Sequence, residues 1–102
     1  MRMMMLVKFP NEDFNDAVIE GEAQAKIDGI LQSVSPECCY FTELDGQRAL
    51  MMVVNIDDAA QIPSYSSPWF LAFDAEVEFK VAITPEELRA AKLGKLGKKW
   101  GG

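Results

Sequence analysis

Residues 38–56 read CCYFTELDGQRALMMVVNI, two apolar runs that meet at Asp45-Gly46. An Asp-Gly pair between two such runs is among the strongest local signals for a β-hairpin, because both residues accept the positive φ of a tight turn. The arm before the turn alternates moderately between two faces, whereas residues 49–54 after it are continuously apolar. The stretch therefore predicts a hairpin whose second strand is buried on both faces.

Two further strands are predicted outside the hairpin. Residues 3–9 are almost continuously apolar and stop at Pro10-Asn11, which indicates another strand buried on both faces. Residues 76–83 alternate charged with apolar side chains, which is typical of a strand with one wet face. After it, Thr84-Pro85-Glu86-Glu87 predicts a capping box that opens a final helix.

Helices are predicted in the two longer gaps between strands. Asn11 is expected to cap one helix that runs to about Val34, where Ser35-Pro36 ends it. Its apolar residues recur every three or four positions and give one buried face. Between the third and fourth strands, Pro63 and Pro68 interrupt the pattern. There we expect a helical turn or two around residues 58–62, a bend, and a short helix opening at Ser67-Pro68.

The predicted order is β-α-β-β-α-β, which matches the ferredoxin-like arrangement of an α+β protein with a four-stranded antiparallel sheet. Two right-handed crossovers interleave in one sheet and place the first and third strands in its centre. Those are the two strands whose sequences do not alternate. We therefore predict a ferredoxin-like domain over residues 1–87 and a basic C-terminal helix or arm over residues 88–102.

The central strands predict more apolar surface than one chain covers. Both helices should lie on one face of the sheet, yet the first and third strands are apolar on both faces. We expect Met3, Met5 and Val7, with their neighbours on the third strand, to form an exposed patch unusual for a soluble monomer. A second copy that packs sheet to sheet around a two-fold axis would cover it.

With these features the chain resembles the dimeric α+β barrel superfamily. The resemblance is carried by the Met3–Phe9 strand, the long first helix, the Asp45-Gly46 hairpin and the Glu76–Val81 strand. It implies a homodimer formed through the sheet face, as in relatives that include cofactor-free monooxygenases, isomerases and haem-binding proteins. A fold does not by itself determine which of these functions a protein has.

Charge is distributed unevenly along the 102 residues, whose formal net charge is −6. Residues 1–87 hold five basic and sixteen acidic side chains, whereas residues 88–102 hold five basic and no acidic ones. The acidic body repels nucleic acid and anionic membranes, and attracts the tail to itself or to a partner copy. Because Gly94, Gly97 and Gly101 disfavour a helix, the tail is expected to be a loosely ordered arm.

The inventory of reactive side chains excludes several kinds of site. The chain has no histidine, so histidine-ligated haem and Ser-His or Cys-His nucleophiles are excluded. Cys38 and Cys39 are adjacent, point to opposite faces of a strand and suit a reducing cytoplasmic compartment. The sequence predicts no metal site and no cofactor. The apolar start is too short for a signal peptide or a membrane span.

Five side chains are candidates for a small-molecule site. Tyr65 and Trp69 could give a polar handle on an apolar pocket wall, although the plainer explanation is that they anchor a proline-broken helix to the core. Arg48 and Tyr40 on the hairpin could bind an anion, although solvation or an ion pair with Glu43 is the plainer fate of Arg48. Asp74 could serve as a buried base, or could cap the preceding helix.

Two functions follow from these observations. One is a small dimeric protein that binds a small hydrophobic molecule, or a cofactor-independent enzyme of the monooxygenase or isomerase kind. The other is a non-catalytic dimeric regulatory or accessory module, which the absence of histidine favours.

Overall fold

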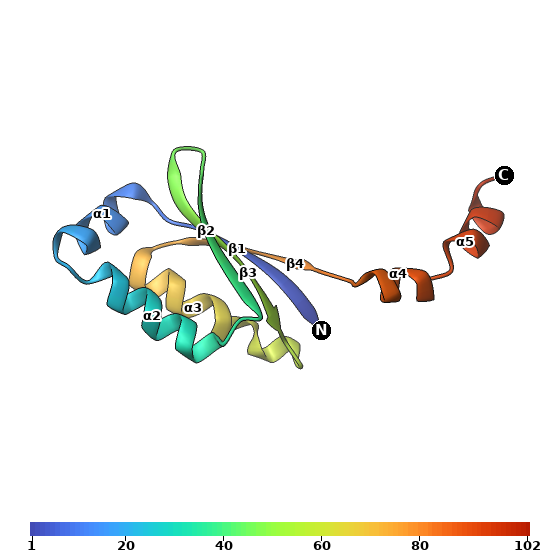
Figure 1. Ribbon diagram of the computed structural model, residues 1–102, viewed down its shortest axis with the longest axis horizontal. Coiled ribbons are helices and arrows are strands. Elements are labelled where there is room, and N and C mark those ends of the chain that lie inside the picture. The colour runs from blue at the N-terminus through green and yellow to red at the C-terminus, as the bar shows by residue number, and fades with distance from the viewer.

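Four strands form one antiparallel sheet in a computed structural model that describes residues 1–102. The strands are β1 (Arg2–Lys8), β2 (Cys38–Leu44), β3 (Gln47–Asn55) and β4 (Glu76–Val81), and their order across the sheet is β2-β3-β1-β4 (Figure 1). The two strands without alternation, β1 and β3, occupy the centre as predicted. The ferredoxin-like α+β fold is confirmed.

The hairpin between β2 and β3 turns at Asp45 and Gly46, with φ angles of 53° and 74°. Positive φ at both central residues is the geometry of a type I′ turn, which matches the right-handed twist of the paired strands. The register pairs Leu44 with Gln47 next to the turn and Cys38 with Val53 at the far end. The hairpin predicted from Asp45-Gly46 is therefore confirmed.

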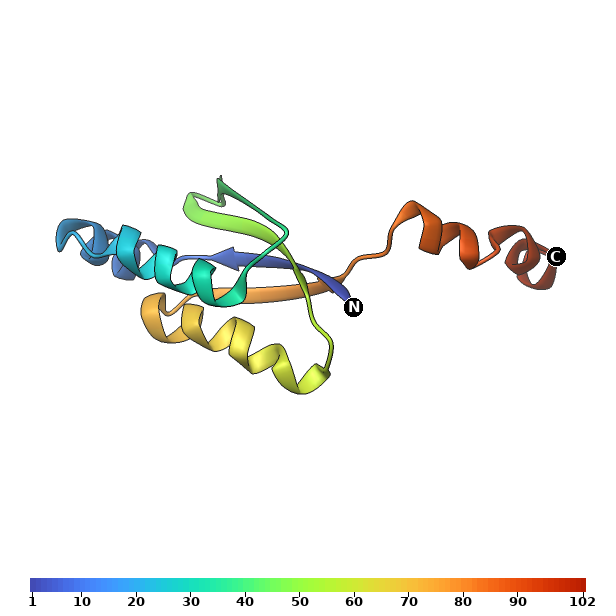
Figure 2. The same cartoon turned by 60° about the horizontal axis from the view of Figure 1, so that its bottom comes forward.

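Three helices pack on one face of the sheet: α1 (Asn11–Ile19), α2 (Ala23–Val34) and α3 (Ile62–Phe73) (Figure 2). Between helices and sheet lies the core, whose largest fully buried side chains are Trp69, Phe9, Phe73, Met5, Leu50, Met52, Val7 and Val54. At about 25 cal/mol per Å² of buried apolar surface, this layer is the main source of stability.

The single helix predicted from Asn11 to Val34 is wrong, because the chain forms α1 and α2 instead. Gly21 breaks the pattern with a φ of 75°, a left-handed conformation that glycine adopts without a steric penalty. Asn11 does not cap α1, since Pro10 occupies that position and Asn11 is the first helical residue. Its Nδ2 instead donates to the Gly46 carbonyl at 3.1 Å and ties α1 to the hairpin.

The bend predicted between Pro63 and Pro68 is also wrong, because α3 runs through both prolines after a 3₁₀ turn at Ala59–Gln61. Pro63 lies in the first turn, where no hydrogen bond is lost. Pro68 lies inside the helix and removes one backbone hydrogen bond. Burial of Trp69 and Phe73, which are both fully covered, offsets that cost.

The prediction that Met3, Met5 and Val7 lie on the exposed sheet face is wrong. These three side chains point toward the helices and are buried. The alternate side chains of β1, Met4 and Leu6, face the uncovered side of the sheet. There they pair with Val53 and Met51, and Tyr40 lies opposite Met51 on β2. We call Met4, Leu6, Tyr40, Met51 and Val53 the open face.

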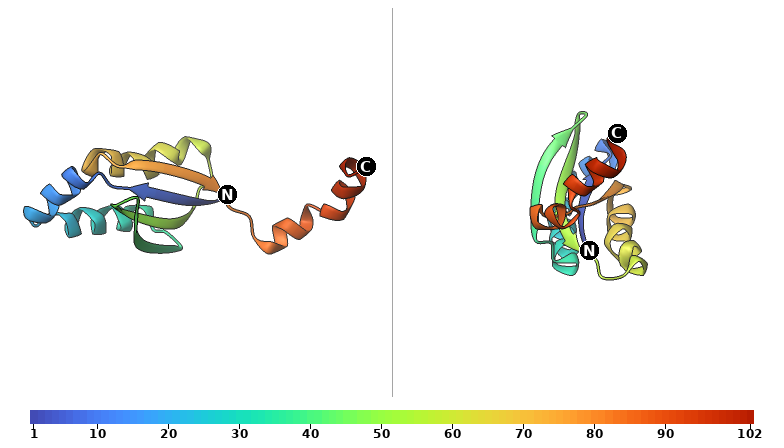
Figure 3. Two further views of the ribbon diagram at one scale, coloured as in Figure 1. Left: turned by 90° about the horizontal axis from the view of Figure 1, so that it is seen from above. Right: turned by 90° about the vertical axis from the view of Figure 1, so that its right-hand side faces the viewer.

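Beyond β4 the chain forms two short helices, α4 (Pro85–Ala90) and α5 (Leu93–Trp100), that project away from the sheet (Figures 1 and 3). Neither helix buries a residue. The loosely ordered arm predicted from the glycines is thus replaced by helical segments. No helix in the chain is both long and hydrophobic enough to span a bilayer.

The predicted capping box at the start of α4 is confirmed. The Thr84 backbone N–H donates to Glu87 Oε1 at 2.9 Å, and the Glu87 N–H donates to Thr84 Oγ1 at 3.1 Å. The first of these bonds, and then the interaction with the Thr84 side chain, holds the pKa of the Glu87 carboxyl below its usual value. The ionised carboxylate therefore stabilises the beginning of α4.

We expect α4 to lose this stabilisation in acid. A group whose folded-state pKa is lowered contributes fully above its unfolded pKa, about 4.3 for glutamate, and loses that contribution as pH falls through the folded value. An NMR titration should show the Thr84 amide shift changing with Glu87 at a pH below 4.3. In Thr84→Ala the backbone N–H of residue 84 still donates to the Glu87 carboxylate, so only the side-chain contribution is lost and the Glu87 pKa should move part of the way back toward its usual value. An unchanged pKa in Thr84→Ala would contradict the contribution assigned to the Thr84 side chain.

Candidate functional site

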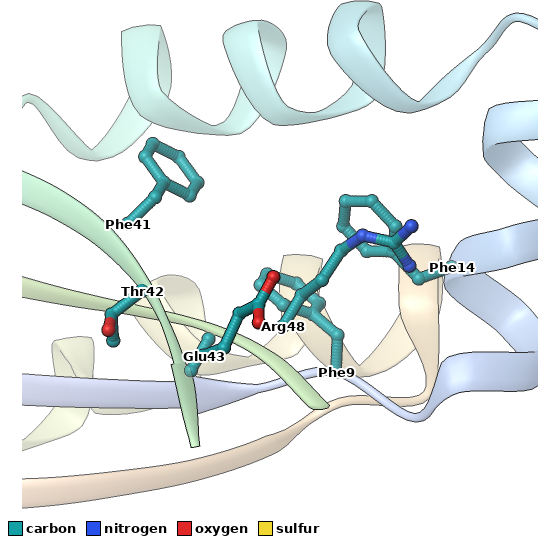
Figure 4. A pocket seen from close by; sticks show the side chains of 7 residues that line it. Phe9, Phe14, Phe41, Thr42, Glu43 and Arg48 are labelled. Atoms are coloured by element: carbon teal, nitrogen blue, oxygen red, sulfur yellow. The ribbon is translucent and has the colours of Figure 1, made fainter. Parts of the chain in front are cut away.

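A cleft of about 310 Å³ lies on the helix side of the sheet, between the β2–β3 hairpin and α1 (Figure 4). Strands β2 and β3 contribute Phe41, Glu43 and Arg48, while Phe9 follows β1 and Phe14 lies on α1. The backbone near Thr42 and Ala49 completes the lining. The hairpin extends beyond the helices at this point. The helices therefore cover the edge strand β2 only partly, and the cleft opens beside it.

The walls of this cleft are aromatic. The Phe9 and Phe14 rings meet edge to face with centroids 5.0 Å apart, and Phe14 stacks on Phe73 at 5.1 Å. Phe9 is fully buried, whereas Phe41 remains 55% exposed although it points to the helix side. The Phe41 ring thus has a surface that no other element of the chain covers. Offset and edge-to-face contacts of this kind favour a further planar ring.

Arg48 supplies the positive charge of the cleft. Its Cζ lies 4.6 Å from the centroid of the Phe14 ring, and its NH1 donates to Asn15 Oδ1 at 2.8 Å. Glu43 is its cross-strand neighbour in the register, yet the two form no ion pair. Of the two plainer fates predicted for Arg48, the ion pair with Glu43 is not formed, whereas the side chain remains partly exposed to solvent.

The position of the guanidinium determines what this cleft can bind. Stacking on Phe14 and the bond to Asn15 fix its plane, while its other N–H groups remain available. A planar fork of donors matches the two oxygens of a carboxylate, and it also binds a phenolate. The aromatic walls beside it suit an unsaturated ring. The arrangement can hold a flat anion with its charged end against Arg48.

The structure does not bring Arg48 and Tyr40 together. Tyr40 lies on the open face and is 66% exposed, whereas Arg48 points to the helix side of the same hairpin. The strand period of two places these side chains on opposite surfaces. An anion site that uses both residues is therefore not formed within one chain.

Tyr65 and Trp69 lie on α3 and do not line the cleft. Trp69 is completely buried and meets the Phe9 ring edge to face at 5.8 Å. Its Nε1 has no hydrogen-bond acceptor in the protein. The Tyr65 hydroxyl donates to the Asn55 carbonyl at 3.3 Å and fastens α3 to the end of β3. In this chain both rings anchor the helix to the sheet.

Asp74 ends α3 in the left-handed conformation, with a φ of 53°. Its backbone N–H donates to the Phe70 carbonyl at 2.9 Å, and its side chain is exposed to solvent. Aspartate is one of the few non-glycine residues that adopt this conformation readily. The carboxylate has the position of a helix end, and it does not line the cleft.

Sequence reasoning missed Phe14, Asn15 and Phe41. Phe41 and Glu43 carried a usable signal, since alternation places both on the same side of β2 as the paired residue Arg48. Asn15 carried none, because its contact with Arg48 joins α1 to the hairpin across a separation of 33 residues. Cys39 also points to the helix side, where burial and then the neighbouring Cys38 raise the pKa of its thiol.

No protein-family model matches the chain, and no curated protein shows significant sequence similarity to it. Among solved structures, it is similar to 5-chloro-2-hydroxyhydroquinone dehydrochlorinase from Burkholderia phenoliruptrix AC1100 in complex with 2,5-dihydroxybenzoquinone. The TM-score is 0.59 at 9% identity, over 85% of this chain and 98% of the enzyme. The designed protein Ferredog-Diesel aligns at 0.47 and 12% identity, over 79% of this chain and 85% of the design. The likeness to the dehydrochlorinase shows the fold.

Proposed function

We propose that the chain is a homodimeric protein that binds a small planar aromatic anion in the cleft beside Arg48. The observation that carries the proposal is a guanidinium without an acidic partner, held flat on Phe14 by Asn15 at the wall of an aromatic cleft.

The size and the chemistry of the cleft support this class of ligand. About 310 Å³ lies at the lower end of the volumes typical of small-molecule sites, which suits a single substituted ring. Phe41 would cover one face of such a ring, while Glu43 could accept a hydrogen bond from a ring hydroxyl. The dehydrochlorinase of similar fold was solved with a planar, oxygenated ring of this kind.

The homodimer is proposed to form through the open face. Met4, Leu6 and Met51 lie side by side in the register of β1 and β3, and no element of the chain covers them. Met4 is 39% exposed and Tyr40 is 66% exposed. Because a second copy would bury the same surface on both partners, one two-fold contact covers both sheets.

Replacing Arg48 by glutamine is expected to weaken ligand binding by about 10- to 100-fold, the cost of one charge-assisted fork of hydrogen bonds. Isothermal titration with benzoate, 4-hydroxybenzoate and 2,5-dihydroxybenzoquinone would measure it. Arg89→Gln on the exposed helix α4 is the charge-matched control and should bind like the parent chain. Equal affinities for the parent and Arg48→Gln would refute the cleft as an anion site.

Catalysis by a cofactor-independent monooxygenase or isomerase mechanism would additionally need a base that contacts the ligand. Asp74 caps α3 outside the cleft, whereas Glu43 is the carboxylate that lines it. We therefore favour the binding role, in agreement with a non-catalytic regulatory or accessory module. Turnover of an acidic phenol that disappears in Glu43→Gln, with ligand affinity retained, would instead establish the enzyme.

A further inference from the structure

The outer edge of β2 is an unpaired strand edge that lacks the usual protection against other strands. β2 lies at one side of the sheet and has β3 as its single neighbour (Figure 1). It contains no proline and no lysine, and its one charged side chain is Glu43. Its register with β3 is continuous, so no bulge twists the edge away. An edge without these features is a template for a strand from another chain.

The register of the hairpin determines which backbone groups of β2 face outward. Leu44 and Gln47 flank the two-residue turn, and in such a hairpin they exchange both of their hydrogen bonds. The Phe9 N–H donates to the Arg48 carbonyl at 2.9 Å, so the next residue of β3 directs its groups to β1, as the alternation requires. Every second residue of β2 therefore directs its N–H and C=O away from the sheet. These residues are Cys39, Phe41 and Glu43.

The helix layer leaves most of this edge open. The side chains of the three outward residues point to the helix side of the sheet, where Cys39 is partly buried. Further along the strand, Phe41 is 55% exposed and Glu43 is exposed as well. The helices therefore do not enclose the edge beside Phe41 and Glu43, and a further strand can lie alongside it.

One two-fold register uses all three outward residues. An antiparallel copy of β2 centred on Phe41 places Phe41 opposite the partner's Phe41, and Cys39 opposite the partner's Glu43. Each copy then has its three outward residues in pairs that exchange two hydrogen bonds each. A register centred on Tyr40 or Thr42 leaves one outward residue of each β2 without a partner in the other. A register centred on Glu43 opposes two carboxylates.

The side chains also match in the register centred on Phe41. On the helix side the two Phe41 rings face each other, and aromatic cross-strand pairs stabilise antiparallel sheets. On the open face, Tyr40 lies opposite the partner's Thr42. Glu43 faces an uncharged cysteine, so no like charges meet directly along the two strands. The edge is thus complementary to itself.

We infer that two copies of the chain pair antiparallel along β2, around a two-fold axis at Phe41, and join their two four-stranded sheets into one. The outward backbone groups of both β2 strands are then satisfied. The outer edges of the joined sheet are the β4 strands, so the assembly is closed at two copies. The contact leaves the open face free and does not depend on the homodimer proposed above.

This pairing adds a side chain of the partner to the proposed ligand cleft. Phe41 lines that cleft, and its exposed surface lies beside the edge of the sheet (Figure 4). Facing side chains of an antiparallel pair have Cβ atoms about 5 Å apart, so the partner's Phe41 would pack on this surface. The second copy thereby extends the aromatic wall of the cleft. This step rests on the proposed function, whereas the pairing of the strands does not.

An extended segment of another protein is the rival occupant, because strand addition to a sheet edge is a common mode of peptide recognition. A foreign segment would need side chains of its own that fit Phe41 and Glu43. A second copy brings β2 itself, whose outward residues all find partners in the symmetric register. The second copy is therefore the occupant that this edge favours.

Cysteine cross-linking with oxidised glutathione tests the register. Facing Cα atoms would lie about 5.5 Å apart, within the range that a disulfide spans. With serine at both native cysteine positions, Phe41→Cys should give a disulfide-linked dimer. A single cysteine at position 39 or 43 should not, because its copy lies about 13 Å away along the partner strand. Glu43→Cys combined with native Cys39, in a Cys38→Ser chain, should restore the linkage with Phe41 intact.

Amide hydrogen exchange followed by NMR tests the ladder in the parent sequence. As protein concentration rises, the N–H groups of Cys39, Phe41 and Glu43 should exchange at least about 10-fold more slowly. Those of Tyr40 and Thr42 should not change, because they already bond β3. Phe41→Glu places two carboxylates at the axis and should abolish the concentration dependence. Phe41→Tyr keeps the ring and should retain it.

The binding of benzoate tests the contribution of the partner's ring. At concentrations where β2 pairs, the affinity should be about 2- to 10-fold higher than in dilute solution, the range expected for one aromatic contact. A constant affinity would show that the partner's Phe41 does not reach the ligand.

Three outcomes would overturn the pairing itself. They are exchange rates in β2 that do not depend on concentration, a disulfide-linked dimer from a cysteine at position 39 or 43 alone, and equal linkage at all three positions. Any of these with retained benzoate binding would leave the ligand site intact. Alternate protection along β2, with equal benzoate affinities for the parent and Arg48→Gln, would instead refute the ligand site and leave the pairing.

Discussion

Replacing Trp69 by alanine is expected to lower the free energy of unfolding by about 3–5 kcal/mol, a large share of the 5–15 kcal/mol typical of a domain. The side chain is fully buried between α3 and the sheet, and its ring meets Phe9 at 5.8 Å. Its removal leaves a void in the only layer that joins helices to strands. Urea denaturation followed by circular dichroism measures the change as a shift in midpoint.

Two further variants make this measurement specific. Trp69→Phe keeps most of the ring and removes an indole N–H that has no acceptor in the protein, so it should cost far less than alanine. Trp100→Ala removes the other tryptophan, which is 76% exposed on the arm, and should leave the midpoint nearly unchanged at low concentration. Equal midpoints for Trp69→Ala and the parent would show that α3 packs elsewhere.

Replacing Met51 by lysine is expected to raise the dissociation constant of the proposed homodimer by at least about 100-fold, or about 2.7 kcal/mol. Met51 lies at the centre of the open face, between Leu6 on β1 and Tyr40 on β2. A charge there would be buried without a partner against the second sheet. Light scattering or sedimentation would detect the shift toward the 11.4 kDa single chain.

A matched substitution on the helix side is the control. Leu71 on α3 is 87% exposed, and Leu71→Lys adds the same charge away from the proposed interface. It should leave both the fold and the dissociation constant unchanged. If the parent chain remains at 11.4 kDa at every accessible concentration, or if Met51→Lys dimerises normally, the open face is not the interface.

The sheet was predictable because its signals are local or periodic. Asp45-Gly46 fixes the hairpin turn through the φ angles that only a few residues accept. Two right-handed crossovers predicted central positions for residues 3–9 and 49–54, and the absence of alternation in these strands agreed with that placement. The side that each residue faces was not predictable for β1. In a run of methionines the two faces of the strand have the same composition. The sequence pattern is therefore the same whether Met3 or Met4 faces the helices.

The helices depended on competition between local preference and packing. At Gly21 the local preference of glycine decides the structure, because its left-handed backbone allows the chain to turn between α1 and α2. At Pro68 packing overrides the tendency of proline to break the helix, because Trp69 and Phe73 must reach the sheet from one continuous helix. A single sequence indicates how much each glycine or proline destabilises a helix. It does not indicate the buried area that offsets this destabilisation.

For the candidate site, Arg48 was identified from the sequence but its surroundings were not. Tyr40 was paired with it because both lie on the hairpin, yet the strand period separates them. Trp69 and Tyr65 drew attention as amphipathic rings, and both anchor α3 to the sheet. The contacts that define the cleft join α1 to the hairpin, and such long-range contacts leave no trace in local pattern.

The edge strand β4 limits how copies of this chain can assemble. Glu76, Glu78 and Lys80 alternate along it, and charged side chains on an edge oppose the addition of a strand from another molecule. Growth of the sheet into fibrils by edge-to-edge strand addition is thus disfavoured at this edge, whatever the concentration. Association through β4 is therefore opposed by its charges, which leaves self-complementary surfaces as the contacts available on this side of the sheet.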